Sequence, residues 1–327
     1  MLRYILKRLL MMIPVLVGVV VVVFTINYFT SISPAAVICG SMATDEQIAA
    51  KEQELGLDKP YLVQIGTYFF NIITKGTLGD SYIYKTPVLD MIASRLPNTI
   101  RIGLCASVLS AMIGIPLGIL AAVKQNSSLD YASTFLAILT GAIPSFCLCL
   151  LLQLLFAMKL HWFPISGVKT WQSYILPIVS VALMPVAMTM RMTRSAMLEA
   201  IRQDYVRTAR AKGLPEKTVI WNHTLKNALI PIITVIGMNI GISLTGSIIV
   251  ETIFNIPGLG FLMNSSISQK DFITTQGCVL VAAFIMTFMT LLTDLVYAVV
   301  DPRIKSQYTK GKKAGKKSKL IKGGDAA

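Results

Sequence analysis

Long runs without a charged residue alternate with short polar segments along this sequence. Six runs approach or exceed the length of about 20 residues that a helix needs to cross the hydrocarbon core of a bilayer. Because every backbone polar group must be satisfied internally in lipid, these runs predict six α-helices. The predicted spans are residues 9–29, 102–123, 134–158, 171–190, 227–250 and 272–300, the last interrupted only by Asp294.

The composition agrees with a membrane protein. Charged residues make up 14% of the 327 positions, against roughly 25% in soluble globular chains. So few charges could not cover the surface of a water-soluble protein of this length, which excludes that class. The five cysteines are odd in number and lie in or beside apolar runs, so they are interpreted as packing residues. The chain is therefore predicted to be an all-α integral membrane protein.

The first apolar run could be a cleaved signal peptide or a permanent helix. A basic start, with Arg3, Lys7 and Arg8, suits both. The run of about 21 residues is longer than the roughly 7–15 residues of a signal-peptide core, and no small-x-small cleavage site follows it. Residues 1–30 are therefore predicted to form a signal-anchor transmembrane helix.

The basic residues are distributed unevenly between the two sides of the membrane. A cytoplasmic N-terminus places 21 of the 30 Lys and Arg residues on the cytoplasmic side, as the positive-inside rule requires. This bias accounts for the net charge of +14, so no nucleic-acid partner is predicted, and a lysine-rich tail is expected to contact membrane lipids. The chain then divides into the anchor helix, an extracytoplasmic loop (31–101), a five-helix core (102–300) that includes a cytoplasmic loop (191–226), and a basic cytoplasmic tail (301–327).

The extracytoplasmic loop is long, and long loops are usually functional. It contains an acidic helical stretch from Thr44 to Leu55, which Thr44 and Asp45 can cap and Gly56 can end. The glycine-rich residues 76–81 lack the Gly-Lys-Ser/Thr of a phosphate-binding loop, so no nucleotide site is predicted there.

The cytoplasmic loop 191–226 has apolar residues at helical spacing with basic residues between them. Ala209, Ala211 and Gly213 are small enough for another protein to approach closely. Gly213 can end a helix in a left-handed cap, and Pro215 suits the start of the next helix. The pattern predicts two short helices joined at a sharp corner, which either dock on a partner protein or touch lipid head groups.

The fifth span (227–250) carries polar residues at regular spacing. Asn239, Ser243 and Ser247 lie four apart and share one stripe of the helix. They are interpreted either as the lining of a translocation path or as interhelical hydrogen-bonding groups. Glu251 follows at the outer end and is interpreted as a gate or a contact for an extracytoplasmic protein, with a plain interfacial carboxylate as the alternative.

Other features of the spans concern packing. Gly237 and Gly241 form a small-xxx-small motif. Asp294 is costly in lipid unless it is paired or close to the membrane boundary. Prolines are expected to mark kinks that could act as hinges, at Pro144, Pro177, Pro185 and Pro231.

Within the cytoplasmic loop the sequence resembles a known family. Residues 204–214, Asp-Tyr-Val-Arg-Thr-Ala-Arg-Ala-Lys-Gly-Leu, are similar to the EAA loop of ABC-importer permeases. The resemblance is to the oligopeptide, dipeptide and nickel branch, and within it to the first, B-type permease of each pair. It extends over most of residues 1–305, and its further matching segments are residues 55–60, 95–99, 114–118, 143–146, 163–167, 251–260 and 294–303.

The resemblance implies a type I ABC-importer permease fold in the cytoplasmic (inner) membrane of a bacterium or archaeon, with six spans and cytoplasmic N- and C-termini. Such a permease pairs with a second, homologous permease. Two ATPase subunits dock on the EAA loops, and an extracytoplasmic solute-binding protein delivers substrate. The chain itself would be no enzyme and hold no cofactor, because ATP and Mg²⁺ belong to the ATPases, which drive alternating access.

The resemblance also implies which residues couple to the ATPases. Ala209 and Gly213 match the alanine and glycine of the EAA signature, and residues 207–214 would form the coupling helix. The family's signature glutamate is replaced by Arg207 and a frequent serine by Pro215. The coupling residues so implied are Asp204, Tyr205, Arg207, Ala209, Arg210, Ala211, Gly213 and Leu214.

Two other functions compete with an ABC permease. An intramembrane enzyme is disfavoured because the chain has two histidines, no His-Glu-x-x-His motif and a single intramembrane carboxylate. A self-contained channel or secondary transporter usually carries several buried ionisable groups, and only Asp294 is available here. The substrate stays open, with peptides preferred and nickel or a metal chelate as the alternative.

Overall fold

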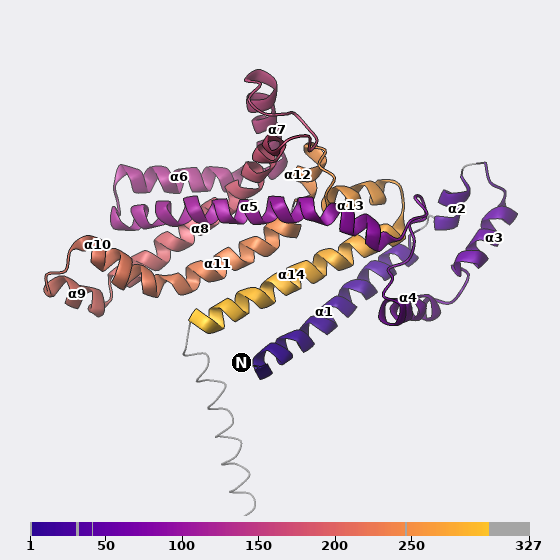
Figure 1. Cartoon of the computed structure of the whole chain (residues 1–327), viewed down its shortest axis with the longest axis horizontal. Coiled ribbons are helices and arrows are strands. Elements are labelled where there is room, and N and C mark those ends of the chain that lie inside the picture. The colour runs from indigo at the N-terminus through magenta and orange to yellow at the C-terminus, as the bar shows by residue number, and fades with distance from the viewer. Residues whose placement is uncertain (1, 31–32, 41, 246, 301–327) are drawn as a thin grey trace, which may run out of the picture.

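The structure, a computed structural model, describes residues 2–30, 33–40, 42–245 and 247–300 (Figure 1). The basic tail predicted for residues 301–327 lies outside them. Their regular structure is helical, which confirms the all-α prediction. The elements are α1 (Leu2–Tyr28), α2 (Pro34–Cys39), α3 (Asp45–Leu55), α4 (Tyr61–Lys75), α5 (Val88–Val123), α6 (Ser128–Ala142), α7 (Ser145–Leu152), the π-helical η1 (Gln153–Lys159), the 3-10 turn η2 (Trp171–Tyr174), α8 (Ile175–Ile201), α9 (Asp204–Ala211), α10 (Glu216–Thr218), the π-helical η3 (Val219–Thr224), α11 (Leu225–Thr245), α12 (Ile248–Ile253), α13 (Leu259–Ser268) and α14 (Phe272–Val300).

Five helical segments of the described chain are long and apolar enough to cross a membrane, and a bent pair of helices brings the number to six if it counts as one span. Two segments extend well beyond the runs predicted from charge, since α5 begins at Val88 rather than at residue 102 and α8 continues to Ile201 rather than ending at residue 190. Charge-free runs mark only the part of a helix inside hydrocarbon, whereas arginines at its ends can extend their charge to the interface. The five segments are Arg8–Tyr28, Val88–Val123, Trp171–Ile201, Glu216–Ile253 and Phe272–Val296.

The prediction of one continuous helix over residues 134–158 is wrong. Helices Ser128–Ala142 and Ser145–Lys159 meet at an angle of 103°. Pro144 has no N–H to donate, and its ring excludes Ile143 from the helical region, so Ile143 is extended at φ −83°, ψ 126°. Of the other predicted kinks, Pro177 lies in the first turn of α8, where a proline is tolerated, while Pro185 and Pro231 lie inside α8 and α11.

The centre of the bundle is the contact between α5 and α8, with α11 packed against both (Figure 1). Two glycines of α5 allow this approach. A Cβ atom on Gly114 would lie 2.8 Å from the Cβ of Thr189, and one on Gly118 would lie 2.5 Å from the Cβ of Thr193. Glycines four apart therefore form a small-xxx-small interface here, on a helix where the sequence analysis did not predict one.

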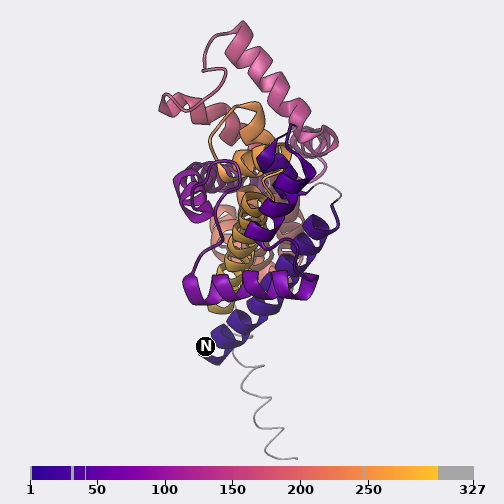
Figure 2. The same cartoon turned by 90° about the vertical axis from the view of Figure 1, so that its right-hand side faces the viewer.

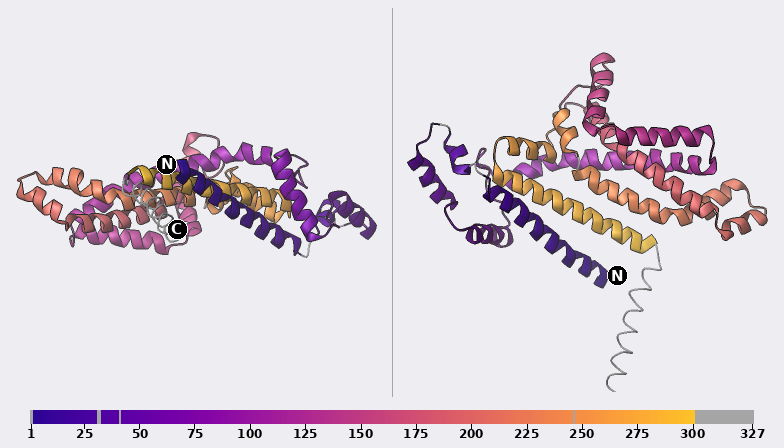
Figure 3. Two further views of the ribbon diagram at one scale, coloured as in Figure 1. Left: turned by 90° about the horizontal axis from the view of Figure 1, so that it is seen from below. Right: turned by 180° about the vertical axis from the view of Figure 1, so that it is seen from behind.

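Of the two packing glycines predicted on α11, Gly237 lies at a close contact with α14 and Gly241 does not. A Cβ atom on Gly237 would lie 2.1 Å from Cγ2 of Thr293 in α14, whereas one on Gly241 would meet nothing closer than Met286, at 3.9 Å. Helix α14 in turn packs against α1, and the two run side by side along one flank of the bundle (Figures 1 and 3).

The two ends of the bundle carry different short helices (Figure 1). One end, called here the α9 end, holds α9 and α10; the other, called the α3 end, holds α2, α3 and α4. Helix α3 begins and ends as its sequence predicts. The Thr44 hydroxyl accepts the N–H of Gln47 while the Gln47 side chain accepts the N–H of Thr44, and Gly56 closes the helix in the left-handed region at φ +69°.

Candidate functional site

The corner between α9 and α10 has the geometry that its sequence predicts. Gly213 lies in the left-handed region at φ +75°, and its N–H donates to the carbonyl of Arg210 at 2.9 Å. Pro215 then directs the chain into α10. Arg210 and Glu216 join across the corner through two hydrogen bonds of 3.1 and 2.6 Å, and the bond to Glu216 raises the pKa of Arg210.

Helix α9 has one face against its own chain and one face toward solvent. Val206 and Ala209 are buried together with Val219 of η3. Tyr205 and Leu214 are exposed, as is Arg207, whose contact with Asp204 is a long 3.8 Å. Ala209 was predicted to admit another protein, but it packs inward.

The exposed positions Ala211 and Gly213 are the small residues that a partner can approach. A Cβ atom added at Gly213 would meet no atom of this chain within 4 Å. Of the eight predicted coupling residues, all except Ala209 are therefore exposed, namely Asp204, Tyr205, Arg207, Arg210, Ala211, Gly213 and Leu214.

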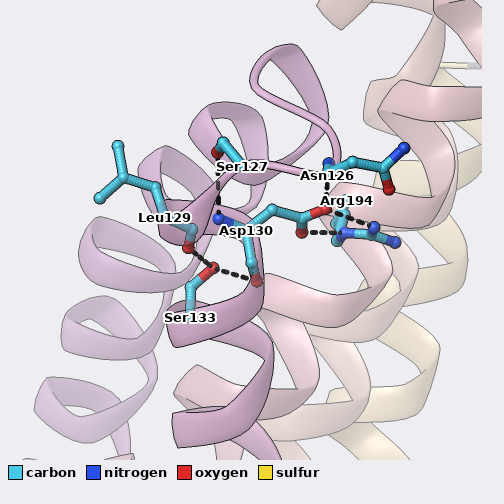
Figure 4. A network of polar contacts seen from close by, with 6 residues as sticks. All are labelled: Asn126, Ser127, Leu129, Asp130, Ser133 and Arg194. Atoms are coloured by element: carbon cyan, nitrogen blue, oxygen red, sulfur yellow. Dashed lines mark hydrogen bonds and ion pairs between the residues drawn. The ribbon is translucent and has the colours of Figure 1, made fainter.

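A charged pair joins α6 to α8, the helix that precedes α9 (Figure 4). Arg194 of α8 donates from Nε and Nη2 to the two carboxylate oxygens of Asp130, at 2.6 and 2.8 Å. Asp130 is 2% exposed and also accepts the N–H of Asn126, while the Ser127 hydroxyl accepts the N–H of Asp130 and caps α6. The sequence alone did not predict this pair, whose residues lie 64 positions apart.

The predicted polar stripe of α11 faces the interior of this chain. Asn239 donates to the hydroxyl of Thr189 in α8 at 3.1 Å. Ser243 is buried, and its hydroxyl has no hydrogen-bond partner among the described residues. Ser247 precedes α12 and donates to Glu251 at 2.6 Å. Since all three are at most 2% exposed, they could line a path only if α8 and α11 separate.

Glu251 is fully buried, at 0% exposure, so it is neither an exposed contact for another protein nor an interfacial carboxylate in this structure. Oε1 accepts hydroxyl hydrogens from Ser247 at 2.6 Å and from Thr99 of α5 at 2.7 Å. Oε2 accepts the N–H of Phe261 at 3.0 Å. Because a Cβ atom on Gly258 would lie 2.3 Å from Oε2, only glycine fits beside this carboxylate.

A second buried carboxylate organises the glycine-rich residues 76–81. Asp271, directly before α14, accepts hydrogen bonds from the Ser81 and Thr274 hydroxyls and from the N–H of Tyr82. Burial, with a smaller contribution from Asp271, raises the pKa of Tyr82 to about 12. This stretch is therefore a loop held against the start of α14, a role that its sequence pattern did not indicate.

The described part of the chain offers no metal site and no disulfide. No group of three or more His, Cys, Asp or Glu residues is placed to hold a metal ion there. Cys149 and Cys278 are buried, Cys105 is exposed, and no disulfide joins the five cysteines.

Comparison with protein families gives two adjacent matches that together cover most of the chain. Residues 114–306 match the family described as binding-protein-dependent transport system inner membrane component. Residues 1–103 match the N-terminal part of the same kind of membrane component.

Curated relatives match over nearly the whole chain. A dipeptide transport system permease of Alkalihalophilus pseudofirmus is 40% identical, over 93% of this chain and 100% of that protein. A glutathione transport system permease of Salmonella choleraesuis is 38% identical, over 93% and 99% of the two chains. Among solved structures, an inward-facing methionine ABC transporter matches with a TM-score of 0.56 and 16% identity, over 65% of this chain and 97% of the other, which supports the fold alone.

Proposed function

Because the chain belongs to the family of binding-protein-dependent transport system inner membrane components, we propose that it forms the membrane path of a peptide importer. The family makes it a multi-pass inner-membrane permease subunit of an ABC importer, with the type I fold and no catalytic activity of its own. The resemblance drawn from residues 204–214 is thereby confirmed. A self-contained channel, a secondary transporter and an intramembrane enzyme are set aside.

Peptides are the proposed substrate class. The relatives reported above are named for dipeptide and glutathione transport, and glutathione is itself a tripeptide. Nickel, the alternative, has no support from these relatives. The path that we propose for the peptide is lined by Asn239, Ser243 and Ser247, which requires α11 to move away from α8 during transport.

The solvent face of α9 is the observation that best supports coupling to separate ATPases. Val206 and Ala209 fix α9 to its own chain, while Tyr205, Arg207 and Leu214 are free to contact a partner. The corner is held rigid by the two hydrogen bonds between Arg210 and Glu216. A rigid, exposed and short helix can transmit a displacement of its partner into the membrane helices on either side of it.

The remaining features of the proposal follow from the family. Two ATPase subunits, which bind ATP and Mg²⁺, dock at the α9 end, a second homologous permease lies beside this chain, and a solute-binding protein delivers peptide at the α3 end. The α9 end then faces the cytoplasm, in agreement with the excess of Lys and Arg in residues 191–226. ATP binding and hydrolysis alternate the access of the path between the two sides.

The test is ATP-driven uptake of a radiolabelled dipeptide by vesicles, measured together with recovery of the ATPase subunits in a pull-down of the tagged chain. Replacing Arg207 and Leu214 with glutamate on the exposed face is expected to abolish both uptake and recovery. Gln125→Glu, in the exposed turn between α5 and α6, is the matched control and should change neither. Unchanged ATPase recovery with the double variant would contradict docking on α9, and failure of the unmodified transporter to move any peptide would contradict the substrate class.

A further inference from the structure

Helix α4 (Tyr61–Lys75) has one face that no part of the described chain covers. Leu62, Phe70 and Ile73 are 76%, 60% and 79% exposed. With Gly66 they recur every three or four residues and so form a single stripe, called here the α4 stripe. An exposed apolar stripe on a helix indicates a surface that is covered in the working molecule.

The opposite face of α4 is polar and turned inward. Gln64, Tyr68 and Asn71 line a cavity of about 590 Å³ that α4 encloses together with the ends of α1 and α14 and with part of α3. Gln64 donates to the carbonyls of Leu57 and Lys59 at 2.8 Å each. The polar side of α4 is thus used by the chain itself, whereas the α4 stripe stays largely exposed.

The position of α4 is fixed by the end of α1. The hydroxyls of Tyr61 and Thr25 are hydrogen-bonded at 2.8 Å, and the Tyr61 ring packs edge-on against Phe24 and Tyr28, with centroids 5.7 and 5.2 Å apart. Helix α4 is seen end-on in Figure 1 and crosswise in Figure 2, so it runs roughly perpendicular to the membrane-crossing helices. It therefore lies parallel to the membrane plane, at the level where α1 leaves the hydrocarbon.

Helix α4 adjoins a candidate membrane span with many exposed apolar side chains. Helix α1 is the outermost span of this flank, and its apolar side chains Ile13, Val22 and Ile26 are exposed along its length. The tyrosines and phenylalanines where α1 meets α4 are the residue types enriched at the membrane–water interface. Lys59 and Lys75, at either end of α4, can reach lipid phosphates.

We propose that α4 is an interfacial helix whose stripe of Leu62, Gly66, Phe70 and Ile73 lies in the lipid leaflet at the α3 end. Such a helix inserts its apolar face about 5–10 Å into the boundary between head groups and acyl chains. It anchors the extramembrane segment at this end at a fixed height above the bilayer. The partner in this proposal is lipid rather than protein because α4 is fixed at the end of α1, a candidate membrane span whose apolar side chains are exposed along its length.

The experiment places a single tryptophan on the stripe and measures its quenching by brominated lipid. The full-length chain is purified both alone and with the subunits that accompany it, the three native tryptophans of the chain and those of the subunits are replaced by phenylalanine, and Ile73→Trp is introduced. It is reconstituted into phosphatidylcholine vesicles brominated either near the glycerol end or near the methyl end of the acyl chain. The expected result is a roughly twofold loss of emission with the first lipid and a smaller loss with the second, as the shallow insertion of an interfacial helix requires.

Two controls bracket this result. Glu54→Trp, on exposed α3, should not be quenched, and Ile13→Trp, within the span of α1, should be quenched more by the methyl-end bromines. Leu62→Trp tests the same stripe independently if Ile73→Trp fails to assemble. Quenching of Ile73→Trp no greater than that of Glu54→Trp, or quenching that disappears once the partner subunits are present, would overturn the proposal and assign the stripe to a protein contact. Neither outcome bears on peptide transport, which the uptake assay tests separately.

Discussion

The guanidinium of Arg8, on α1, lies 2.7 Å from the carboxylate of Asp294, on α14. This pair accounts for a carboxylate inside a span that would otherwise be costly in lipid. It joins two helices that pack along one flank of the bundle, and it gives Arg8 a structural role in addition to the role in orientation that the positive-inside rule predicts.

Removing Arg8 should therefore leave the carboxylate of Asp294 unpaired and lower the free energy of unfolding. We expect Arg8→Ala to lower the thermal unfolding midpoint in detergent, with a loss of about 1–2 kcal/mol because the pair is only partly buried. Adding Asp294→Asn to Arg8→Ala should restore most of the loss. Additive effects of the two substitutions would show that the residues do not interact.

The pair of Asp130 and Arg194 should be worth more, since the carboxylate is almost fully buried and the arginine binds it with both arms. Asp130→Asn is expected to cost about 2–3 kcal/mol, which is at or below the figure for a fully buried pair because part of Arg194 remains exposed. Arg194→Lys should also destabilise, because an ammonium group cannot make the two-pronged contact. Asp204→Asn, in the long and exposed contact with Arg207, serves as the control and should leave the unfolding midpoint unchanged.

The close approach of α5 and α8 predicts a sharp difference between glycines. Gly118→Ala places a Cβ atom 2.5 Å from that of Thr193 and should cost about 1–3 kcal/mol through overpacking. Gly141→Ala, in α6, meets nothing within 4 Å and should be neutral or slightly stabilising, because alanine favours helix. Thermal midpoints of the two variants measured side by side test this, and equal effects would argue against a tight α5–α8 contact.

The buried carboxylate of Glu251 predicts an ordered series of variants. Glu251→Leu leaves the N–H of Phe261 and the hydroxyl of Thr99 without their acceptor, at a cost of about 1–3 kcal/mol for each unpaired group. Glu251→Gln should be milder, because its carbonyl can still accept from Phe261 while the hydroxyls rotate to accept from its amide. Membrane insertion and thermal midpoint should both follow this order. A Leu variant as stable as the unmodified protein would exclude a structural role.

Variants of Gly213 can distinguish two reasons for a glycine at this position, its left-handed backbone conformation and the close approach of a partner. Asparagine tolerates the left-handed region better than other residues with a Cβ atom, so Gly213→Asn should fold and insert normally. If a partner must approach this position closely, Gly213→Asn and Gly213→Asp should both abolish ATP-driven uptake while membrane insertion stays intact. Uptake that survives in the Asn variant but not in Gly213→Val would assign the glycine to backbone conformation alone.

Local sequence signals predicted local structure well. The capping residues of α3, the left-handed Gly56 and the corner at Gly213 all follow from the conformational preferences of single residues or adjacent pairs. Five of the six apolar runs likewise located a helix, because the bilayer imposes a minimum length on each, whereas the run 134–158 contains two helices that meet at 103°. They did not give the true ends of α5 and α8, since a helix does not stop where the hydrocarbon stops.

Contacts between distant residues could not be predicted in this way. Asp130 and Arg194 lie 64 positions apart in the sequence, and Thr99 and Glu251 lie 152 positions apart. Glu251 was interpreted as a gate, a contact for an extracytoplasmic protein or an interfacial carboxylate, and its burial depends on donors from Thr99 and Phe261. The burial of Ala209 likewise depends on Val219, which belongs to η3.

The exposed corner at Gly213 leads into α11 through continuous helical structure. Helix α10 passes through the π-helical turn η3 into α11, and these thirty residues from Glu216 to Thr245 form one rod about 45 Å long. The rod begins at the residue that Arg210 binds and ends close to Ser247, which binds Glu251. If a partner bound at α9 shifts the Glu251 cluster through this rod, a ligand that favours the shifted cluster must strengthen binding of the partner by the same factor.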